Sequence, residues 1–487
     1  MRDQKVLGWA YCLAINYNAK GMKNITQNVK KIRKGDVLKL KVTAMASQGQ
    51  GVAKHKIEDG LFTVFLDGVA EGDQVNAEIF KIKNRWALGK VVEIVKPSKK
   101  RIEPRCKHFS ECGGCTFQHL EHEEQMKIKK QFTIDAFERL GNFQKPPVQD
   151  VLFAGEEWFY RNKMELSFGE DKDRNLALGF HVPNRRFDIF NLEECFLESE
   201  FLPTLVEFMR NFAIDHKLKP VNSFGEGKLL TLTIREGKNT DERLVYLTTT
   251  KGPFRWMKKL GLQLQEFFPA EINSFYWMEK IAERGTPTKI IPHHIFGEQN
   301  LKEKLEINDM TFDFIIEPQA FFQPNTRGAE LLYAEVLKQV GDVSKKTVFD
   351  LFCGTGTIGI TIAPSAKKVI GVEINTDAVK SARQNALINH LENMEFVCGD
   401  VVKVLSSVKE KPDVIVLDPP RAGLLPASID DICVFKPKRI VYVSCNPSTL
   451  ARDCALLCEK GYKLLQIQPV DMFPQTYHVE NVVLLEL

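Results

Sequence analysis

The chain has 487 residues, of which 44% are hydrophobic and 27% charged, and its net charge at pH 7 is +4. The length suggests two to four domains, and the composition excludes disordered, collagen-like and fibrous classes. No apolar run reaches the roughly 20 residues that span a bilayer. Residues 1–28 are interpreted as an N-terminal extension, with Met22 as a candidate natural start. Its apolar patch Val6–Ile15 has no clean cleavage site, so we expect no signal peptide.

Positive charge is concentrated near the N-terminus. From Lys20 to Arg101 there are 18 Lys and Arg against 8 Asp and Glu, an excess of +10, which leaves the remaining chain near −6. A basic module attached to a mildly acidic body is typical of a nucleic-acid-binding appendage. The alternative interpretation is an ordinary solvated basic surface.

This basic segment has the pattern of a small β-barrel. We expect strands at Val37–Val42, Leu61–Leu66, Gly68–Asp73, Val75–Ile82 and Trp86–Ile94, with a turn at Gly49–Gly51. Five short strands with glycine turns predict a closed antiparallel barrel. The pattern resembles a TRAM domain, which implies RNA binding. We assign the barrel to residues 29–96, and Pro97 and Lys99–Arg101 to a linker.

The eleven cysteines are spread thinly, and most stand singly in apolar stretches, such as that of Cys353. Only Cys106, Cys112 and Cys115 cluster, at a spacing that suits one metal site. This usage predicts reduced thiols and a cytoplasmic protein. Residues 97–324, which contain the cluster, mix strand-like and helical runs and are expected to form a central α+β domain.

From about Asn325 onward, apolar strands alternate with helical patterns. We expect strands at Thr347–Phe352, Lys368–Ile374, Met394–Cys398, Asp413–Asp418, Arg439–Cys445, Lys463–Val470 and Val479–Leu487. This alternation predicts an α/β fold with a doubly wound parallel sheet. Only a short turn, Phe473–Tyr477, separates the last two strands, so the final strand should be antiparallel. Seven strands with the last one reversed are the layout of class I methyltransferases, which we assign to residues 325–487.

The first strand of this sheet leads into a glycine-rich turn. Gly354, Gly356 and Gly359 match G-x-G-x-x-G between a strand and a helix, and Glu373 ends the next strand. Such glycines let the backbone approach a nucleoside-bearing ligand, whose ribose hydroxyls a carboxylate can bind. This pattern alone does not separate NAD from S-adenosylmethionine. The Asp-Pro-Pro-Arg-Ala-Gly run that begins at Asp418 favours S-adenosylmethionine, because methyltransferases acting on planar nitrogenous substrates often carry Asn/Asp-Pro-Pro there.

Cys445 is the candidate nucleophile among the cysteines. It lies at the carboxyl end of a predicted strand, and Pro447 opens the following helix. The partial positive charge at a helix N-terminus should lower the pKa of the thiol and favour the thiolate. The carboxyl ends of the parallel strands share one edge, and a reversed last strand would bring Glu480 to the same edge.

Five motifs, in this order, resemble the RNA uracil-C5 methyltransferase family: Gln323-Pro-Asn325, Asp350–Gly356, Asp418–Gly423, Ser444-Cys-Asn-Pro447 and His478-Val-Glu480. With the barrel and the cysteines, the resemblance covers residues 29–487 and is closest to the bacterial 23S rRNA branch. It implies that Gln323, Phe352, Thr357, Glu373, Asp400 and Asp418 contact S-adenosylmethionine. It also implies that Cys445 is the nucleophile and Glu480 the base. Position 357 is threonine where some members have asparagine.

The chemistry of uracil explains these two catalytic roles. C5 is a poor nucleophile, and a thiolate that adds to C6 produces an enolate whose C5 can attack a sulfonium methyl group. A base must then remove the C5 proton so that elimination releases the enzyme. The uracil has to leave its stack to be attacked, which favours a flipped or loop uridine in RNA. Phe321 and Phe322 are candidates either for lining its pocket or for the core.

By the same resemblance, Cys195 joins Cys106, Cys112 and Cys115 as a metal ligand. Four thiolates suit either zinc or a 4Fe–4S cluster, and spacing does not separate the two. His108 and His119 leave a mixed zinc site open. The family pattern favours 4Fe–4S in a structural or RNA-positioning role, because the methyl transfer needs no redox step.

The sequence leaves three alternatives to 23S rRNA methylation. They are the same chemistry on tRNA, a non-catalytic RNA-binding protein, and an NAD-linked oxidoreductase with an iron–sulfur cluster. The joint presence of Cys445 and Glu480 argues against the second, and Asp418-Pro-Pro would have no role in the third. We expect no membrane association and no obligate protein partner.

Overall fold

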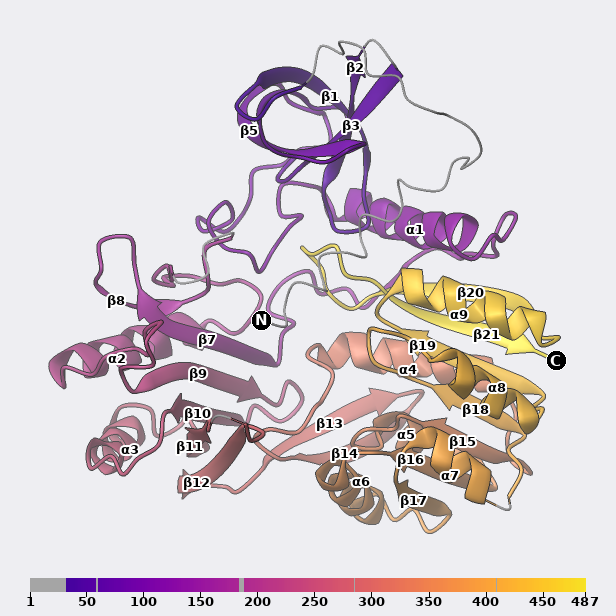
Figure 1. The fold of residues 1–487 in the computed structure, drawn as a ribbon. Coiled ribbons are helices and arrows are strands. Elements are labelled where there is room, and N and C mark those ends of the chain that lie inside the picture. The colour runs from indigo at the N-terminus through magenta and orange to yellow at the C-terminus, as the bar shows by residue number, and fades with distance from the viewer. Residues whose placement is uncertain (1–31, 58–59, 184–187, 284, 409) are drawn as a thin grey trace.

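The computed structural model describes the chain except for residues 1–31, 58–59, 184–187, 284 and 409, so the expected N-terminal extension lies outside the described residues. Figure 1 shows a small barrel at the top, a central sheet with two helices at the left, and a larger sheet at the lower right. Among the described helices, none is long and apolar enough to cross a membrane.

The barrel closes in the strand order β1-β2-β3-β5-β4. Its strands are β1 (Val37–Met45), β2 (Gly51–Ile57), β3 (Gly60–Leu66), β4 (Gln74–Ile82) and β5 (Trp86–Lys96). The strand expected at 68–73 is wrong: this segment is a turn, in which Asp73 accepts the Ala70 N–H at 2.7 Å, and β2 supplies the fifth strand. The barrel is also not wholly antiparallel, because β3 and β5 pair in parallel.

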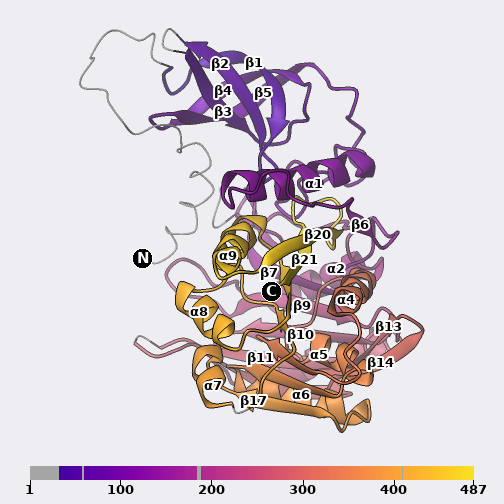
Figure 2. The same ribbon diagram turned by 90° about the vertical axis from the view of Figure 1, so that its right-hand side faces the viewer.

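Helix α1 (His122–Arg139) joins the barrel to the rest of the molecule. Both views show it beneath the barrel and beside the larger sheet (Figures 1 and 2). The barrel core is completed by Phe132 of α1 and by Phe117 and Leu120, which belong to the segment 106–120 that carries the clustered cysteines and is called the cysteine segment below. Phe137, from the same helix, belongs to a core of the larger sheet. The barrel is therefore packed on the body rather than tethered by a free linker.

The central sheet has the order β12-β11-β10-β9-β7-β8, in which only β10 and β11 are parallel. Its strands are β7 (Lys163–Glu170), β8 (Leu176–Gly179), β9 (Leu229–Glu236), β10 (Arg243–Thr249), β11 (Ser274–Ile281) and β12 (Lys289–Gly297). Helices α2 (Phe201–Asp215) and α3 (Trp256–Phe267) cover one face and share its apolar core.

The larger sheet has the order β17-β16-β15-β18-β19-β21-β20-β6. Its strands are β15 (Thr347–Leu351), β16 (Lys368–Glu373), β17 (Met394–Cys398), β18 (Val414–Leu417), β19 (Arg439–Ser444), β20 (Lys463–Asp471), β21 (Glu480–Glu486) and β6 (Leu152–Phe153). All seven expected strands are present, and the expected reversal of the last strand is confirmed, because β21 is antiparallel to both β19 and β20. The short β6, from the central segment, adds an eighth strand.

Helices cover both faces of this sheet, as the doubly wound prediction requires. One face packs against α4 (Thr326–Val340), α5 (Thr357–Ile362) and α6 (Thr376–Ile388). The other packs against α1, α7 (Val401–Ser407), α8 (Pro426–Val434) and α9 (Pro447–Glu459). The hairpin of β13 (Leu301–Ile307) and β14 (Met310–Ile316) packs on α4 and α6.

Candidate active site

The turn after β15 has an unusual backbone. Phe352, Gly354 and Gly356 have positive φ values of 65°, 55° and 80°. A Cβ at Gly356 would meet Ala382 and Phe396 at 3.1 Å, so this position requires glycine. The turn places Phe352 at the carboxyl edge of the sheet and directs the Gly354 N–H to Glu373 Oε2, at 3.1 Å.

Two carboxyl groups flank this turn. The Asp350 Oδ2 accepts the Gly359 N–H at 2.8 Å, while its Oδ1 is buried without a hydrogen-bond partner among the described residues. Burial raises the pKa of Asp350 to about 7. Glu373, at the end of β16, also accepts the Asn375 N–H at 2.8 Å. A glycine turn between a buried acid and a strand-end carboxylate fits a nucleoside-bearing ligand such as S-adenosylmethionine.

The other residues expected at the cofactor lie on elements around the same edge. Thr357 begins α5, and its hydroxyl lies 3.1 Å from the Tyr333 hydroxyl. Asp400 is exposed and caps α7 by accepting the Lys403 N–H at 3.3 Å. Gln323 is buried, and its carbonyl accepts the Asn162 side-chain amide at 2.9 Å. Tyr333, on which the charges of Asp418 and Glu480 act, links Thr357 to these two acids, whereas no described contact links Asp400 or Gln323 to them directly.

Cys445 and Glu480 are brought together by the pairing of β19 with β21. Cys445 follows β19, and Ser444 lies opposite Asn481, the residue after Glu480. The Glu480 side chain is buried, with 5% of its surface exposed. The charges of Glu480 and Asp418 both act on the Cys445 thiol, so the three groups form one cluster at the sheet edge.

Arg421 is the cation of this cluster. Its guanidinium donates a hydrogen bond to His478 Nδ1 at 3.0 Å, and it is also a hydrogen-bond partner of the Cys445 thiol. The Arg421 carbonyl accepts the Asn446 side-chain amide at 3.0 Å. A role for Arg421 was not predicted from the sequence, although its position directly after Asp418-Pro-Pro was the available signal.

The pKa values in this cluster differ from the expectation for Cys445. Burial and the charge of Glu480 raise the pKa of the thiol to about 11, although Arg421 acts to lower it. The predicted depression was wrong because desolvation next to two acids outweighs the helix terminus, whose Ser448 N–H is capped by the Asn446 side chain. Burial and the charge of Asp418 likewise raise the pKa of Glu480 to about 8. Burial raises that of Asp418 to about 7.

The loop between β20 and β21, which leads to Glu480, is held by segments distant in sequence. The Tyr160 hydroxyl donates to the Pro474 carbonyl at 3.0 Å. The Thr116 and Phe117 N–H groups both donate to the Gln475 carbonyl, at 2.9 and 3.0 Å. The position of Glu480 therefore depends on the central domain and on the cysteine segment.

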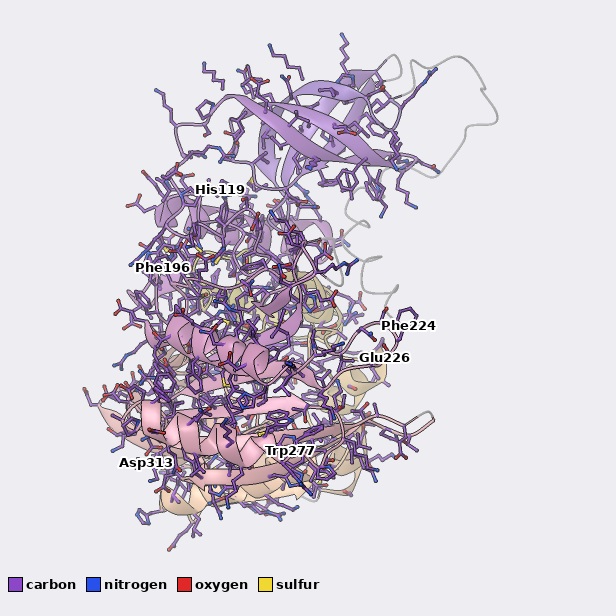
Figure 3. The ribbon with its side chains drawn as sticks, turned by 90° about the vertical axis from the view of Figure 1, so that its left-hand side faces the viewer. His119, Phe196, Phe224, Glu226, Trp277 and Asp313 are labelled. Carbon is purple, nitrogen blue, oxygen red and sulfur yellow. The ribbon has the colours of Figure 1, made fainter. Side chains whose placement is uncertain are left out.

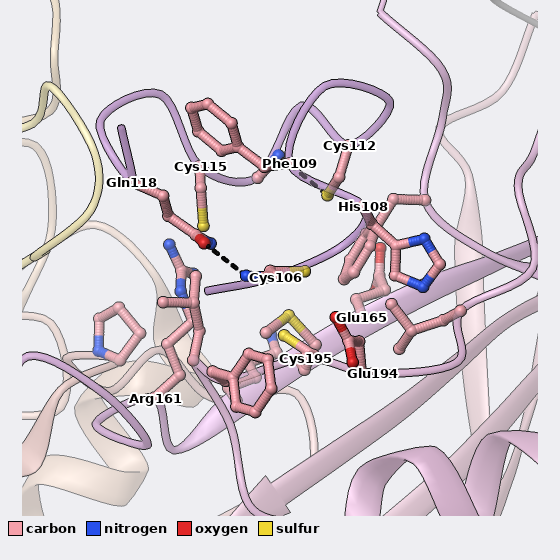
Figure 4. A pocket seen from close by; sticks show the side chains of 18 of the residues that line it. Cys106, His108, Phe109, Cys112, Cys115, Gln118, Arg161, Glu165, Glu194 and Cys195 are labelled. Atoms are coloured by element: carbon pink, nitrogen blue, oxygen red, sulfur yellow. Dashed lines mark hydrogen bonds between the residues drawn. The ribbon is translucent and has the colours of Figure 1, made fainter. Parts of the chain in front are cut away.

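The four expected metal ligands line one cavity of about 400 Å³. Figure 4 shows Cys106, Cys112, Cys115 and Cys195 around it, together with Arg161. All four cysteines are free thiols, and burial raises their pKa values, to about 11 for Cys112 and about 12 for Cys115.

The histidines do not complete a zinc site at this cavity. Among the described residues, no group of three or more His, Cys, Asp or Glu side chains is arranged to hold a metal ion. His119 faces the barrel, with its Nε2 3.0 Å from the Val69 carbonyl. His108 lines the cavity, but its Nε2 accepts the Glu193 N–H at 3.1 Å. The mixed zinc site that the sequence left open is therefore not formed by these side chains.

The two phenylalanines before Gln323 have different environments. Phe322 is buried and packs on Phe314, with ring centroids 5.6 Å apart, so it is a core residue. Phe321 is 66% exposed and lines the cysteine cavity. Its carbonyl accepts the Thr355 hydroxyl, in the glycine-rich turn, at 3.3 Å. Phe321 thus lies between the cysteine cavity and the cofactor turn.

Comparisons with known proteins agree with this architecture. The profile of the family described as tRNA (uracil-5-)-methyltransferase matches residues 122–487, and the TRAM domain profile matches residues 31–92. An uncharacterised RNA methyltransferase of Caldanaerobacter subterraneus subsp. tengcongensis is 37% identical over 471 residues, covering 93% of this chain and 99% of the relative. Another, from Chlorobaculum tepidum, is 35% identical over 475 residues, covering 93% and 97%.

A solved structure extends the similarity to the whole fold. The Pyrococcus abyssi tRNA (uracil-54, C5)-methyltransferase in complex with S-adenosyl-L-homocysteine has a TM-score of 0.72 and 28% identity, covering 92% of this chain and 100% of that one. The barrel is thereby confirmed as a TRAM domain and the larger sheet as a class I methyltransferase fold. The chain belongs to the tRNA (uracil-5-)-methyltransferase family and is an S-adenosylmethionine-dependent RNA methyltransferase.

Proposed function

We propose that the protein methylates C5 of a uridine in 23S rRNA, in the cytoplasm, through a covalent bond between Cys445 and C6 that is resolved by Glu480. The cluster of Cys445, Glu480, Asp418 and Arg421 carries the chemical part of this proposal, whereas the choice of 23S rRNA rests on the sequence resemblance alone. It combines a thiol, a buried acid with a pKa of about 8, and a cation that contacts the thiol. These are the groups that addition to C6 and proton removal from C5 require.

In this mechanism Cys445 adds to C6 of the flipped uracil and so makes C5 nucleophilic. Arg421 stabilises the thiolate before the addition, since it is the cation that lowers the thiol pKa. S-adenosylmethionine supplies an electrophilic methyl group. Once C5 has bonded to the methyl group, Glu480 takes the C5 proton, and elimination of the Cys445 sulfur restores the double bond between C5 and C6.

The proposed cofactor contacts are Gln323, Phe352, Thr357, Glu373, Asp400 and Asp418. Phe352, Glu373 and Asp418 lie at the ends of three neighbouring parallel strands, where open α/β sheets bind their ligands. The Thr357 hydroxyl lies within hydrogen-bond distance of the Tyr333 hydroxyl. Burial raises the pKa of Tyr333, and the charges of Asp418 and Glu480 raise it further. This contact supports a place for Thr357 beside the methyl-transfer site.

The assay has to distinguish 23S rRNA from tRNA. The P. abyssi enzyme, whose name gives tRNA as its substrate, aligns over its whole length, so the TRAM barrel does not choose between the two RNAs. Purified protein and methyl-labelled S-adenosylmethionine should be incubated with unmodified 23S rRNA and tRNA transcripts in separate reactions, followed by nucleoside analysis. Labelled 5-methyluridine from 23S rRNA is the expected result. The same product from tRNA alone would keep the chemistry and overturn the substrate, whereas another nucleoside would overturn the chemistry.

We further infer that the cysteine cavity holds a 4Fe–4S cluster rather than zinc. Although the described side chains do not stand in a metal-ligating arrangement, the four thiols line one cavity of about 400 Å³, and the family resemblance favours a 4Fe–4S cluster over zinc for such a set of ligands. Arg161 lines the same cavity, and its buried Nε has no hydrogen-bond partner among the described residues. This guanidinium supplies positive charge and a free donor beside the thiolates that would ligate the cluster.

Metal analysis tests this inference. Protein purified without oxygen should contain about four irons and four acid-labile sulfides, and Cys195→Ser should lower both. Cys433→Ser is the matched control, since Cys433 is half-buried on α8 and does not line the cavity. One equivalent of zinc without acid-labile sulfide would overturn this inference and assign a zinc site to the cavity.

A further inference from the structure

A continuous series of aromatic rings lies on the helix-covered side of the central sheet, which Figure 3 faces and where Trp277 is labelled. In order, the rings are His216, Phe212, Trp256, Phe254, Trp277 and His293, with successive centroids 4.1, 6.2, 5.4, 5.8 and 4.3 Å apart. Phe212 and Phe254 are buried, whereas the other four are partly exposed. Packing of α2 and α3 explains the two buried rings but does not require the exposed edges of the others.

Seven exposed cations surround this series, and we call them the central basic surface. They are Lys217, Lys219, Lys228, Lys251, Arg255, Lys258 and Lys259. Backbone hydrogen bonds join their segments: the Lys228 N–H donates to the Lys219 carbonyl, and the Thr250 N–H donates to the Lys228 carbonyl, both at 2.9 Å. The Lys228 ammonium lies 4.5 Å from the Phe254 ring centre, and the Lys259 Nζ lies 3.1 Å from His216 Nε2.

The charge of this surface is largely uncompensated. Within the described part of the chain, none of the seven cations forms an ion pair. The exposed acids on these segments and on α2 and α3 are Glu207, Asp215, Glu226 and Glu266, and Glu226 accepts the Asn222 side-chain amide at 3.0 Å. Nearby Glu279 is engaged by the Gly252 N–H at 2.7 Å and by His293 at 3.1 Å. Seven cations against four exposed acids leave the surface with an excess of positive charge.

An exposed aromatic side chain stands beside these cations. Phe224 is 88% exposed at the tip of the turn between Lys219 and Lys228, and Figure 3 labels it. The turn is ordered by its own hydrogen bonds, because the Asn222 side chain accepts the Phe224 N–H at 2.9 Å and the Glu226 N–H at 3.0 Å. A phenylalanine held in solvent by a structured turn is placed to stack on a planar partner.

This surface is on the far side of the central sheet from the active site. Successive strand residues point to opposite faces. On β11, Phe275 and Trp277 face the side covered by α2 and α3. Tyr276 and Met278, which point the other way, belong to the core that includes α4 and α5. A ligand bound here would not occupy the uridine pocket.

We propose that the central basic surface is a second RNA-binding surface, which holds a single-stranded segment of the substrate RNA outside the active site. Bases would stack on Phe224 and on the exposed edges of Trp256 and Trp277, while the cations neutralise phosphates. Single-stranded nucleic acids bind surfaces that combine positive charge with aromatic rings. Recognition of an acidic protein would use the positive charge but would not require the exposed rings. The inference rests on the proposed function only in taking RNA as the substrate.

The test compares RNA binding by two charge-reversed proteins over a series of KCl concentrations. K251E/R255E/K258E alters the central basic surface. K345E/K411E/K438E is the matched control, because these lysines are exposed, form no ion pair in the described structure and precede β15, β18 and β19. The probe is whichever of the 23S rRNA and tRNA transcripts the wild-type protein methylates, or the 23S transcript if neither is methylated.

The first variant should bind this RNA at least tenfold more weakly than the control, and its salt slope should be lower by about 2, since each phosphate contact on a single strand contributes about 0.7. Phe224→Ala should weaken binding at least about fivefold without changing the slope, because stacking is not ionic. Methylation of a short hairpin around the target uridine should be unchanged in both. Loss of that activity would contradict the placement of this surface outside the active site and so would overturn the proposal.

Equal binding by the first variant and the control would overturn the proposal, even if the wild-type enzyme methylates RNA normally. Failure of the wild-type to methylate any RNA would instead refute the proposed function and leave the binding comparison interpretable. If polyglutamate displaces the wild-type protein from RNA as well as poly(U) does, the surface is a general anion site and the RNA assignment is wrong.

Discussion

Glu480, the proposed base, lies where burial favours its protonated form. Burial and Asp418 raise its pKa to about 8, and the pKa of Cys445 is raised to about 11. Both groups must lose a proton before reaction, so kcat/KM for methyl transfer should increase as the pH rises from about 6 to about 9. Initial rates measured over this pH range, on the RNA that the protein methylates, test this increase. A profile that falls over this range would contradict the role of Glu480.

Replacing Glu480 should separate the two halves of the reaction. Glu480→Gln keeps the size of the side chain but cannot take the C5 proton, so the Cys445 adduct with RNA should accumulate. It would appear as a protein–RNA band that resists denaturation. Cys445→Ala, alone or combined with Glu480→Gln, should give no band while still binding S-adenosylmethionine. A band without Cys445 would remove the nucleophile assignment.

Arg421 should control how readily the Cys445 thiol ionises. Removing the guanidinium in Arg421→Met takes away both its hydrogen bond and its charge, which lower the pKa of the thiol. Alkylation of Cys445 by iodoacetamide at pH 9 should therefore be slower in this variant, and Arg421→Lys should lie between it and the wild-type. Mass spectrometry of the Cys445 peptide gives the rate. Equal rates in all three proteins would exclude Arg421 from this role.

Motifs and strand order were enough to predict which residues lie at this edge of the sheet. The reversed final strand was deduced from one short turn, and that was enough to put Glu480 near Cys445. The thiol pKa was predicted in the wrong direction, because it depends on burial by segments that local sequence does not reveal. The bond between Arg421 and His478 joins two distant loops and was equally hidden.

At the scale of elements, helix α1 is fixed to β20 by a buried ion pair. The Lys129 Nζ donates to Asp471 Oδ1 at 2.6 Å and to the Phe473 carbonyl at 2.9 Å, and both charged side chains are buried. Asp471→Asn leaves the cation unpaired and should lower the free energy of unfolding by about 3–5 kcal/mol. Urea unfolding measures the change.

A matched substitution separates burial from charge in this experiment. Asp150→Asn breaks a comparable 2.6 Å pair with Lys130, but its carboxylate is 97% exposed, so the unfolding free energy should hardly change. In the double variant Lys129→Met/Asp471→Asn, much of the lost stability should return, because no buried charge remains. If Asp471→Asn were as mild as Asp150→Asn, the Lys129 pair would not be what fastens α1.

Element prediction succeeded where periodicity is strong and failed where side chains override it. Four parallel strands of the larger sheet, β15, β16, β18 and β19, are almost entirely buried and read as apolar runs, which made them predictable. In the barrel, residues 68–73 resemble a strand, but Asp73 accepts backbone N–H groups of Ala70 and Ser98 and makes a turn. Strand β2, rich in lysine and glycine, lacks the apolar alternation that would have revealed it.

At the scale of the whole molecule, the domain boundaries at 96 and 324 stay predictions, and the packing crosses both. Phe117 and Leu120 of the central segment complete the barrel core, and β6 of the same segment extends the larger sheet. The sequence could not show this interlocking, since it depends on contacts between distant segments. Removing the barrel would expose those two side chains, so its RNA-binding role is better tested by surface charges.

Lys39, Lys41 and Lys83 are exposed on the barrel and form no ion pair within the described residues. If the TRAM barrel contacts phosphates, K39E/K41E/K83E should lower the salt slope of RNA binding by about 2 to 3, with little change in methylation of a short hairpin. The barrel and the central basic surface share no residues, so their effects on binding free energy should add in the combined variant. RNA affinity measured over a series of KCl concentrations compares the two parent variants with the combined variant. A combined variant no weaker than either parent would mean that the loss of one surface already removes the contribution of the other, and it would contradict independent binding by the two surfaces.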